Sequence, residues 1–256
     1  MDATAAHLAR VPPGTWAGLK QRSQGALRLR AGQRVLDLGC GAATDTLALG
    51  RRVGPAGQVS GVDYDAGVVQ QARARALAEG QGGWVSHHHA NATALPWPEG
   101  AFDASHCVAM LQHLLEPDRA LDELLRVTRR GGPVVVADID WATLSIECGE
   151  PGIERRLVRH RIGFGVPNPH AGRRLHGLLW ARGLEQLQCE IWPLWASELA
   201  AADELLQRRQ LEDEALAAGV VDDQDLLRWR AALARSSATH ALFVSVNAVL
   251  VSGRKP

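Results

Sequence analysis

The sequence lacks an excess of charge of either sign. Lys and Arg together number 28, as do Asp and Glu, so the formal net charge is zero. A general nucleic-acid-binding surface needs a basic excess, so binding to nucleic acid is not expected. Also absent is any run of about 18 apolar residues, and the first ten residues hold no long apolar core. We therefore expect neither a membrane span nor a secretory signal.

Cysteine and most aromatic residues are scarce. The four cysteines, at positions 40, 107, 148 and 189, are too far apart for a zinc motif. This pattern favours a reduced, cytoplasmic setting. One Tyr and three Phe stand against eight Trp, and we expect most of the tryptophans in the core. At 256 residues the chain is long enough for one substantial α/β domain.

What the chain does contain is an apolar run that ends in a glycine-spaced turn. Residues 35–38 are followed by Gly39 and Gly41, and a helix-forming stretch begins at Thr44. This is the strand–turn–helix opening of a nucleotide-binding α/β domain. Because glycine has no Cβ atom, the backbone can turn sharply and approach a ligand. Asp37, two residues before the first glycine, would repel a pyrophosphate and attract an ammonium group.

Two acidic residues distinguish between cofactors. A dinucleotide fold has a third glycine where this chain has Thr44, and an uncharged turn facing phosphate, so Asp37 and Thr44 disfavour a nicotinamide oxidoreductase. Asp63 ends the next apolar run, near the spacing at which a carboxylate binds ribose hydroxyls. An acid for an amino-acid head group and an acid for a ribose fit S-adenosylmethionine (SAM), which has no phosphate and carries a sulfonium cation.

Strand-like and helix-like runs alternate along the chain, which predicts a parallel sheet with helices on both faces. The strands are expected at 34–38, 58–62, 84–88, 102–108, 133–139, 184–191 and 241–252. The helices are expected at 44–52, 66–79, 119–129, 153–162, 172–181, 197–218 and 223–234. Asp222 or Asp223 is expected to cap the last helix. Before residue 31 one or two short helices are expected, with a break at residues 12–14.

Four segments occur in the order found in a known family. They are the turn 35–41, the acid and ring at 62–64, the adenine-edge segment 90–103, and the turn 126–132 before the fifth strand. Over residues 31–141 the chain therefore resembles class I SAM-dependent methyltransferases, most of all the small-molecule group with quinone and natural-product methyltransferases. The adenine segment commonly carries Asp where this chain has Asn91. An Asn oxygen can still accept a hydrogen bond from the adenine amino group.

The resemblance implies a Rossmann-like, seven-stranded, mostly parallel sheet whose last strand, 241–252, is antiparallel and lies beside 184–191. It implies one domain over residues 1–256, with a helical lid at 1–30, a SAM-binding core at 31–141, and substrate-side helices and the last strands at 142–256. The residues expected to bind SAM, or its product S-adenosylhomocysteine, are Asp37, Gly39, Cys40, Gly41, Thr44, Asp63, Tyr64, Asn91, Ala92, Cys107 and Val108.

Methyl transfer from SAM is an in-line displacement, so the protein mainly has to align nucleophile, methyl group and sulfur. A base is needed only where the nucleophile must lose a proton. His113, just past the fourth strand, is the candidate base, because open α/β sheets place their ligands at that edge. The alternative is that it packs and hydrogen-bonds at a helix start. The run 87–89 of three histidines is not expected to bind metal, since neighbouring strand residues point to opposite faces.

Five residues are candidates for substrate binding: Trp16, His113, Trp141, Arg173 and Trp195. Trp141 could stack on a planar substrate or pack beneath a lid. Arg173 could bind a substrate carboxylate through two hydrogen bonds or form a structural salt bridge. Trp16 and Trp195 could line an apolar substrate chamber.

These features favour SAM-dependent methyl transfer to oxygen, nitrogen or carbon of a small, apolar or aromatic metabolite or a peptide natural product. Residues 107–110 carry no Asn/Asp-Pro-Pro-Tyr motif, which disfavours methylation of amino groups on nucleic-acid bases. The alternative is a protein that binds SAM on the same fold without transferring the methyl group, as a cyclase or an activating partner. The expected partner is a small-molecule substrate, without nucleic acid or membrane, and a homodimer is a candidate assembly.

Overall fold

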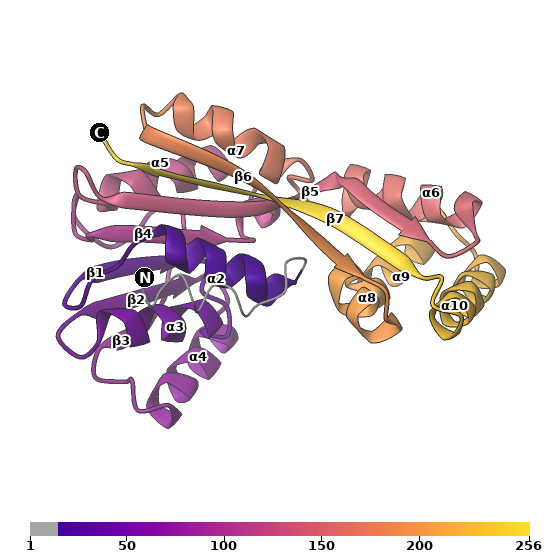
Figure 1. Cartoon of the computed structure of the whole chain (residues 1–256), viewed down its shortest axis with the longest axis horizontal. Coiled ribbons are helices and arrows are strands. Elements are labelled where there is room, and N and C mark those ends of the chain that lie inside the picture. The colour runs from indigo at the N-terminus through magenta and orange to yellow at the C-terminus, as the bar shows by residue number, and fades with distance from the viewer. Residues whose placement is uncertain (1–14) are drawn as a thin grey trace, which may run out of the picture. The chain divides into compact units, whose positions relative to one another are not determined.

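Seven strands form one sheet in the order β3-β2-β1-β4-β5-β7-β6 in the computed structural model, which describes residues 15–256 (Figure 1). The strands are β1 (Arg34–Leu38), β2 (Gln58–Asp63), β3 (Val85–His89), β4 (Ala104–Val108), β5 (Pro133–Glu147), β6 (Glu185–Ala196) and β7 (Phe243–Arg254). The pairs β1–β2, β2–β3, β1–β4 and β4–β5 are parallel. Every residue of β4 is buried, as expected for a parallel strand covered on both faces.

The last strand runs antiparallel to its neighbours, as the sequence predicts. The backbone N–H of Asn247 donates to the Thr143 hydroxyl, while Lys255 exchanges backbone hydrogen bonds with Gly131 and Gly132. Rising numbers in β7 therefore meet falling numbers in β5. Between β5 and β6, β7 occupies the position expected for it.

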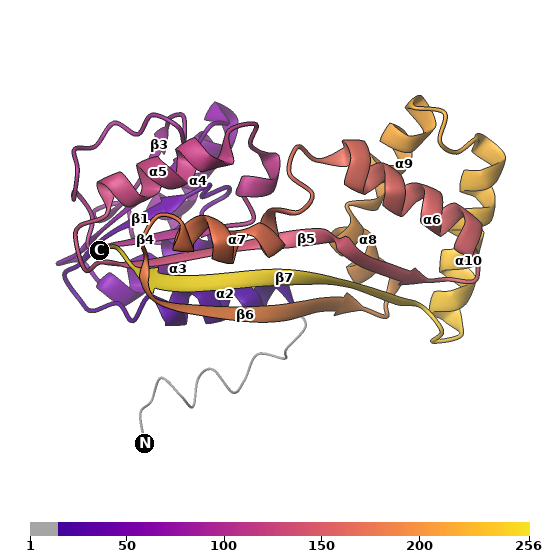
Figure 2. The same cartoon turned by 90° about the horizontal axis from the view of Figure 1, so that it is seen from above.

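Helices cover both faces of the parallel part of the sheet. The helices of the described residues are α2 (Trp16–Ala26), α3 (Thr44–Val53), α4 (Ala66–Ala78), α5 (Pro117–Val127), α6 (Pro151–His160), α7 (Ala171–Trp180), α8 (Leu199–Leu206), α9 (Arg208–Ala217) and α10 (Asp223–Ala238), with short turns at η1 (Leu111–His113) and η2 (Arg161–Gly165). Right-handed crossovers place α3 and α4 on one face and α5 on the other, because the strand order reverses at β1. Figure 2 shows α2 and α3 on the side of the strands opposite α5.

Side-chain contacts agree with these two layers. On one face, Gln24 of α2 donates to Asp45 of α3 at 2.8 Å, and α3 pairs with α4 through Arg51 and Glu79. On the other face, Arg182 just beyond α7 binds residues of α5. The reversal between β1 and β4 creates a switch point, where open α/β sheets bind ligands at the carboxyl ends of the strands.

The chain divides into two compact units, each described by itself below. One comprises 20–138, 174–190 and 250–256, and contains the parallel strands, α3, α4 and α5. The other comprises, among the described residues, 15–19, 139–173 and 191–249, and contains α6, α8, α9 and α10. The prediction of a single domain stays a prediction. The part of the expected N-terminal lid that precedes residue 15 lies outside the described residues, and 16–26 form the helix α2.

Two predicted boundaries in the C-terminal half were wrong. The single helix expected at 197–218 is two helices, separated at Gln207, whose φ of 48° is left-handed. The strand expected to end at residue 139 continues to Glu147. It can do so because the carboxylates of Asp138 and Asp140 both accept hydrogen bonds where they are buried. The Gln112 N–H donates to Asp138, and Arg173 donates to Asp140.

The strand expected at 184–191 also runs on to Ala196, and the helix expected at 223–234 to Ala238. The cap predicted for that helix was confirmed. Asp222 caps α10: its side chain accepts from the Asp225 N–H, and the Asp225 side chain accepts from the Asp222 N–H.

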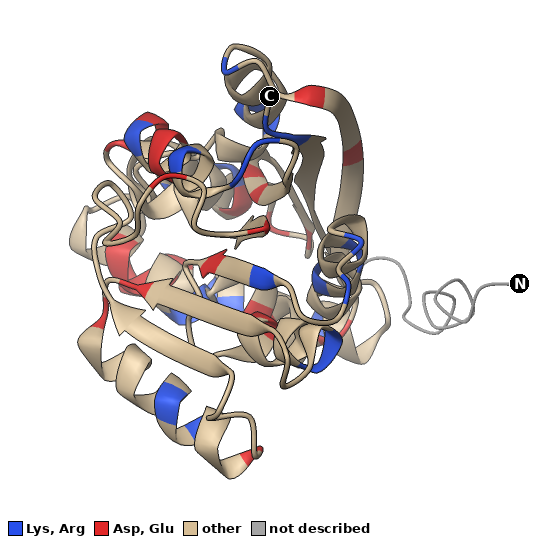
Figure 3. Ribbon diagram, turned by 90° about the vertical axis from the view of Figure 1, so that its left-hand side faces the viewer, with Lys and Arg blue, Asp and Glu red and all other residues tan. Residues whose placement is uncertain are grey.

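No helix among residues 15–256 is long and apolar enough to cross a membrane. Figure 3 shows acidic and basic residues interspersed along the ribbon, as the equal numbers of the two charges lead one to expect.

Candidate cofactor site

The turn after β1 forces the backbone into the left-handed region. Gly39, Gly41 and Ala43 have φ of 77°, 50° and 69°. The N–H groups of Gly39 and Cys40 both donate to the Val62 carbonyl, at 2.8 and 2.9 Å. A Cβ atom at Gly39 would lie 2.7 Å from Cγ of Met110. Glycine at position 39 is thus required by conformation and by close packing at once.

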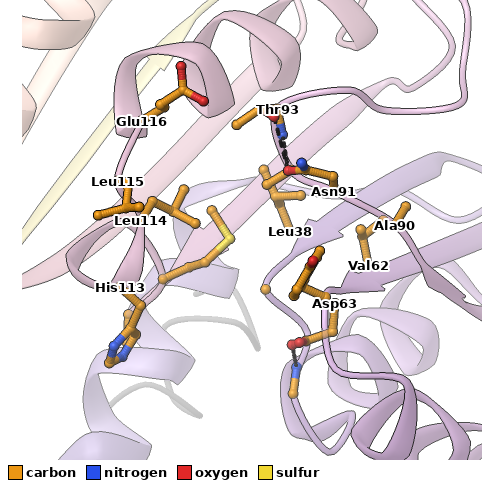
Figure 4. Close-up of a pocket in the computed structure, with 16 residues that line it drawn as sticks. Leu38, Val62, Asp63, Ala90, Asn91, Thr93, His113, Leu114, Leu115 and Glu116 are labelled. Carbon is orange, nitrogen blue, oxygen red and sulfur yellow. Dashed lines mark hydrogen bonds between the residues drawn. The ribbon is translucent and has the colours of Figure 1, made fainter. Parts of the chain in front are cut away.

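Asp63, at the end of β2, holds this turn and faces a pocket. One carboxylate oxygen accepts from the Gly41 N–H at 2.9 Å (Figure 4). The other accepts from the Asp65 N–H at 3.1 Å. A carboxylate offers about four lone-pair sites, so each oxygen can accept one further hydrogen bond. Asp63 therefore has the free acceptor capacity that a pair of ribose hydroxyls requires.

The pocket has a volume of about 650 Å³. Pockets of about 300–1,000 Å³ hold ligands of drug size. Figure 4 shows two walls: Leu38, Val62, Asp63 and Asn91 on one side, and residues 113–116 on the other. The predicted residues that line it are Gly39, Gly41, Asp63, Tyr64, Asn91, Ala92 and His113. Segments expected to form a cofactor site are thus brought together at the switch point of the sheet.

Asn91 and Tyr64 line the pocket in different ways. The Asn91 side-chain oxygen accepts from the N–H and the hydroxyl of Thr93, both at 3.0 Å. That oxygen was expected to accept from an adenine amino group, but in the structure it closes a local turn and leaves the amide NH₂ to donate. The Tyr64 ring is 76% exposed and lies 6.0 Å from the His89 ring, which leaves one of its faces open to a ligand.

The Asp37 carboxylate was expected to face a ligand over the turn, and the structure places it elsewhere. It is buried, with one oxygen 2.9 Å from Nδ1 of His106 and the other accepting from the Thr46 hydroxyl at 2.9 Å. Asp37 and His106 are direct register partners on β1 and β4. Because strand side chains alternate between faces, this register turns the carboxylate into the α2–α3 layer.

Four further predicted residues adjoin the pocket without lining it. Thr44 is exposed and accepts from Arg75 of α4 at 3.3 Å. Cys40 is buried, and burial, with the charges of Asp37 and Asp63, raises the pKa of its thiol. Cys107 and Val108 are paired inside the sheet. The chain leaves the sheet one residue later, so the residues that do line the pocket are Ala109, with a φ of 57°, and Met110.

The wall formed by residues 113–116 was only partly foreseen. His113 ends the turn η1 and is exposed, while Leu114, Leu115 and Glu116 follow it along the pocket. Leu115 is 89% exposed. The sequence signal that could have found this segment is the apolar pair Leu114 and Leu115 directly after His113, at the edge where open α/β sheets bind their ligands.

The remaining predicted substrate residues belong to the unit that contains α6 and α8 to α10, and they are not among the residues that line the pocket. Trp141 is buried, and the Arg161 guanidinium lies 4.9 Å from its ring centroid. Arg173 donates to Asp140 at 2.5 Å. Trp195 is half-exposed and stacks on Phe243 at 6.3 Å. Trp16 is half-buried in α2.

Two of these positions favour the structural alternative weighed from the sequence. Arg173 is engaged in an ion pair with Asp140, and Trp141 packs under Arg161.

Among residues 15–256, no three His, Cys, Asp or Glu side chains are grouped so as to hold a metal ion. Of the three neighbouring histidines, His87 is buried, His88 is half-buried and His89 is exposed.

Comparison with known proteins agrees with this arrangement. Residues 35–132 match the model of the methyltransferase domain family. The O-methyltransferase resE of Aspergillus sclerotiorum is 31% identical over 158 residues, which cover 62% of this chain and 57% of that protein. The chain thus spans little more than half the length of this curated relative.

Solved structures share the fold. The [4+2]-cyclase SpnF superposes with a TM-score of 0.60 at 23% identity, covering 99% of this chain and 92% of that one. The geranyl diphosphate C-methyltransferase from Streptomyces coelicolor A3(2), in complex with Mg²⁺, geranyl-S-thiolodiphosphate and S-adenosylhomocysteine, superposes with a TM-score of 0.61 at 16% identity. This match covers 94% of this chain and 76% of that one.

Proposed function

We propose that the protein transfers the methyl group of SAM to a small molecule, because residues 35–132 match the model of the methyltransferase domain family and the pocket lies in this segment. The acceptor atom is an oxygen, nitrogen or carbon of an apolar or aromatic metabolite, or of a peptide natural product. The observation that carries the proposal is the pocket at the switch point, with Asp63 on one wall and His113 on the other.

The residues around the pocket fit SAM. The carboxylate of Asp63 keeps two acceptor sites for ribose hydroxyls, and the amide of Asn91 keeps its donors for the adenine edge. Val62, Ala90 and Ala92 supply an apolar lining for the base. Gly39 and Gly41 let the backbone approach the ligand, and the space a Cβ would fill at Gly41 is open. No part of the lining demands a phosphate.

SAM supplies a methyl group already activated for displacement, so the protein's task is alignment and, for some acceptors, removal of one proton. Fixing a nucleophile in line with the reacting carbon can contribute about 7–11 kcal/mol to lowering the barrier. Met110, Leu114 and Leu115 present an apolar surface on the wall opposite Asp63. This wall supports the choice of an apolar acceptor. His113, on the same wall, would accept the proton of a hydroxyl or amine acceptor through a ring nitrogen.

A second function rests on the same pocket: binding SAM without transferring its methyl group, as a cyclase or an activating partner. The observation that favours this second function is that the fold of a [4+2]-cyclase matches this chain over nearly its whole length. At 23% identity that likeness concerns the fold alone. The pocket residues support SAM binding equally in both cases, so a chemical test has to separate them.

The test is a labelling experiment. The purified protein is incubated with methyl-labelled SAM and an extract of its source organism, and the mixture is searched by mass spectrometry for a labelled compound. Methyl transfer predicts a new labelled product together with S-adenosylhomocysteine, both absent when an Asp63→Ala variant replaces the protein. A cyclase instead converts a component of the extract into an isomer of unchanged mass, while SAM is not consumed. That second result would overturn the methyltransferase proposal.

A further inference from the structure

Beneath the cofactor turn, three side chains far apart in the sequence form one buried chain of hydrogen bonds. Ser23 of α2 lies 2.9 Å from Nε2 of His106 on β4, and Nδ1 of His106 lies 2.9 Å from Asp37 on β1. Ser23 and His106 are fully buried, and Asp37 is 2% exposed. The second oxygen of Asp37 accepts from the hydroxyl of Thr46, on the far side of the turn.

The hydrogen bonds around Ser23 fit one arrangement of the protons. The Ser23 hydroxyl lies 2.8 Å from the Lys20 carbonyl, and when it donates there, Nε2 of His106 is the donor in its bond to Ser23. The other ring nitrogen faces a carboxylate, which only accepts, so Nδ1 carries a proton as well. His106 is therefore an imidazolium, held by Ser23 on one side and by the Asp37 carboxylate on the other.

The charges around the ring agree with that assignment. Asp45, in the first turn of α3, is buried beside it and binds Lys20 at 2.8 Å and Gln24 at 2.8 Å. Burial acts against the charged ring, but the hydrogen bond to Asp37 and the charges of Asp37 and Asp45 raise the pKa of His106 above its usual value, against a smaller opposing effect of Lys20.

The histidine and cysteine side chains near Asp37 other than His106 stay neutral. Burial lowers the pKa of His87 on β3, and it raises the pKa of the thiols of Cys40 and Cys107. The carboxylate of Asp37 thus has one cationic partner among these groups, His106. Removing the charge from His106 would leave Asp37 as a buried carboxylate with only the Thr46 hydroxyl and a neutral ring beside it.

The order serine–histidine–aspartate resembles that of a hydrolase, but the hydroxyl is not available for chemistry. Ser23 has no exposed surface, its proton is bound to a carbonyl of its own helix, and it does not line the pocket. What the chain of bonds does reach is the cofactor turn: Asp37 precedes residues 39–43, Thr46 follows them, and their hydrogen bond closes the turn from behind.

We propose that His106 is a positioning residue for the cofactor turn: its cationic ring fixes Asp37, Asp37 holds Thr46, and this clamp keeps residues 39–43 in the strained conformation that binds SAM. The proposal rests on the proposed function for its ligand, although the clamp exists in the free protein. Since the pKa of His106 is raised, the charged ring persists to higher pH than in a free histidine, and the clamp is lost as the pH rises through that pKa.

The experiment follows S-adenosylhomocysteine binding by titration calorimetry between pH 7 and about pH 9.5 in wild type and in His106→Gln. Coupling between two sites typically amounts to about 5- to 150-fold in affinity, so the wild-type dissociation constant should rise about tenfold across this range. His106→Gln should bind about tenfold more weakly at pH 7, with a flat profile. The matched control is His87→Gln, which removes a buried histidine whose two ring nitrogens have no hydrogen-bond partner, and should keep the wild-type profile.

A second variant and a ligand-free readout cover the remaining outcomes. Ser23→Ala removes the acceptor of Nε2–H along with the bond to the Lys20 carbonyl, so the midpoint of the pH profile should move to lower pH, which a mere loss of stability would not produce. Hydrogen exchange of the amides of residues 39–43 in the free protein should accelerate with the same midpoint, beyond the intrinsic pH dependence seen in His87→Gln. A flat wild-type exchange profile would overturn the clamp, whereas absent ligand binding with a pH-dependent turn would overturn only the proposed function.

Discussion

Replacing Asp63 tests the cofactor site at its best-defined side chain. The carboxylate joins two parts of the site, because it accepts from the Gly41 N–H at 2.9 Å and from the Asp65 N–H at 3.1 Å while facing the pocket. Asp63→Ala removes the acceptors for the ribose hydroxyls and the hydrogen bond between the turn and the end of β2. The N–H groups of Gly41 and Asp65, which then lose their acceptor, can hydrogen-bond to water. Most of the lost free energy should therefore appear in ligand affinity rather than in stability.

The magnitude follows from the number of hydrogen bonds. A hydrogen bond to a charged group contributes about 1.5–3 kcal/mol, and two ribose hydroxyls sharing one carboxylate should be near the lower value each. We expect a loss of about 2–3 kcal/mol in the affinity for S-adenosylhomocysteine, or roughly 30- to 150-fold. Asp63→Asn keeps one acceptor oxygen and should fall between wild type and the alanine variant.

The assay is isothermal titration with S-adenosylhomocysteine, with thermal melting as a check of folding. Asp65→Ala is the matched control, since Asp65 is two residues away and caps α4 through the N–H groups of Gly67 and Val68. Losing that cap should cost about 1 kcal/mol of stability and leave the affinity unchanged. If Asp63→Ala bound as tightly as wild type, or if Asp65→Ala lost as much affinity, the assignment of Asp63 would be refuted.

Three further predictions concern other residues. His113→Ala should lower kcat about 10²- to 10⁴-fold with little change in KM for SAM if His113 is the base, and an unchanged kcat in steady-state assays would leave it a packing residue. Trp16→Ala with Trp195→Ala should weaken acceptor binding more than S-adenosylhomocysteine binding; equal losses would mean plain core roles. Hydrogen bonding from Arg156 lowers the pKa of Asp225 from 3.8 to about 2, so its stabilisation is present above pH 3.8 and lost as pH falls through about 2. In the Asp225→Ala variant the melting temperature should therefore depend less on pH within that window than in wild type. A variant whose melting temperature changes with pH as in wild type would contradict this.

Features set by short-range sequence were predictable. The turn at Gly39 and Gly41 and the acid at the end of β2 each depend on a few neighbouring residues, and the structure has them where the sequence placed them. The same holds for the cap at Asp222, whose partner lies three residues away. The order of the strands followed because alternating strands and helices allow few arrangements.

Features set by contacts across the sheet were not predictable in the same way. The orientation of Asp37 depends on His106, 69 residues later, which becomes its partner only through the register of β1 and β4. A histidine inside an otherwise buried strand was the available signal, because a buried polar ring needs partners. Likewise Asp140 looked like the end of a strand, and only Arg173, 33 residues on, lets the strand continue.

The account depends most on the identity of the ligand in the 650 Å³ pocket. Titrating the purified protein with S-adenosylhomocysteine and, separately, with NAD tests it most directly. We expect saturable binding of one S-adenosylhomocysteine per chain and no response to NAD. Tight binding of NAD, with no response to S-adenosylhomocysteine, would contradict the assignment of the pocket to SAM.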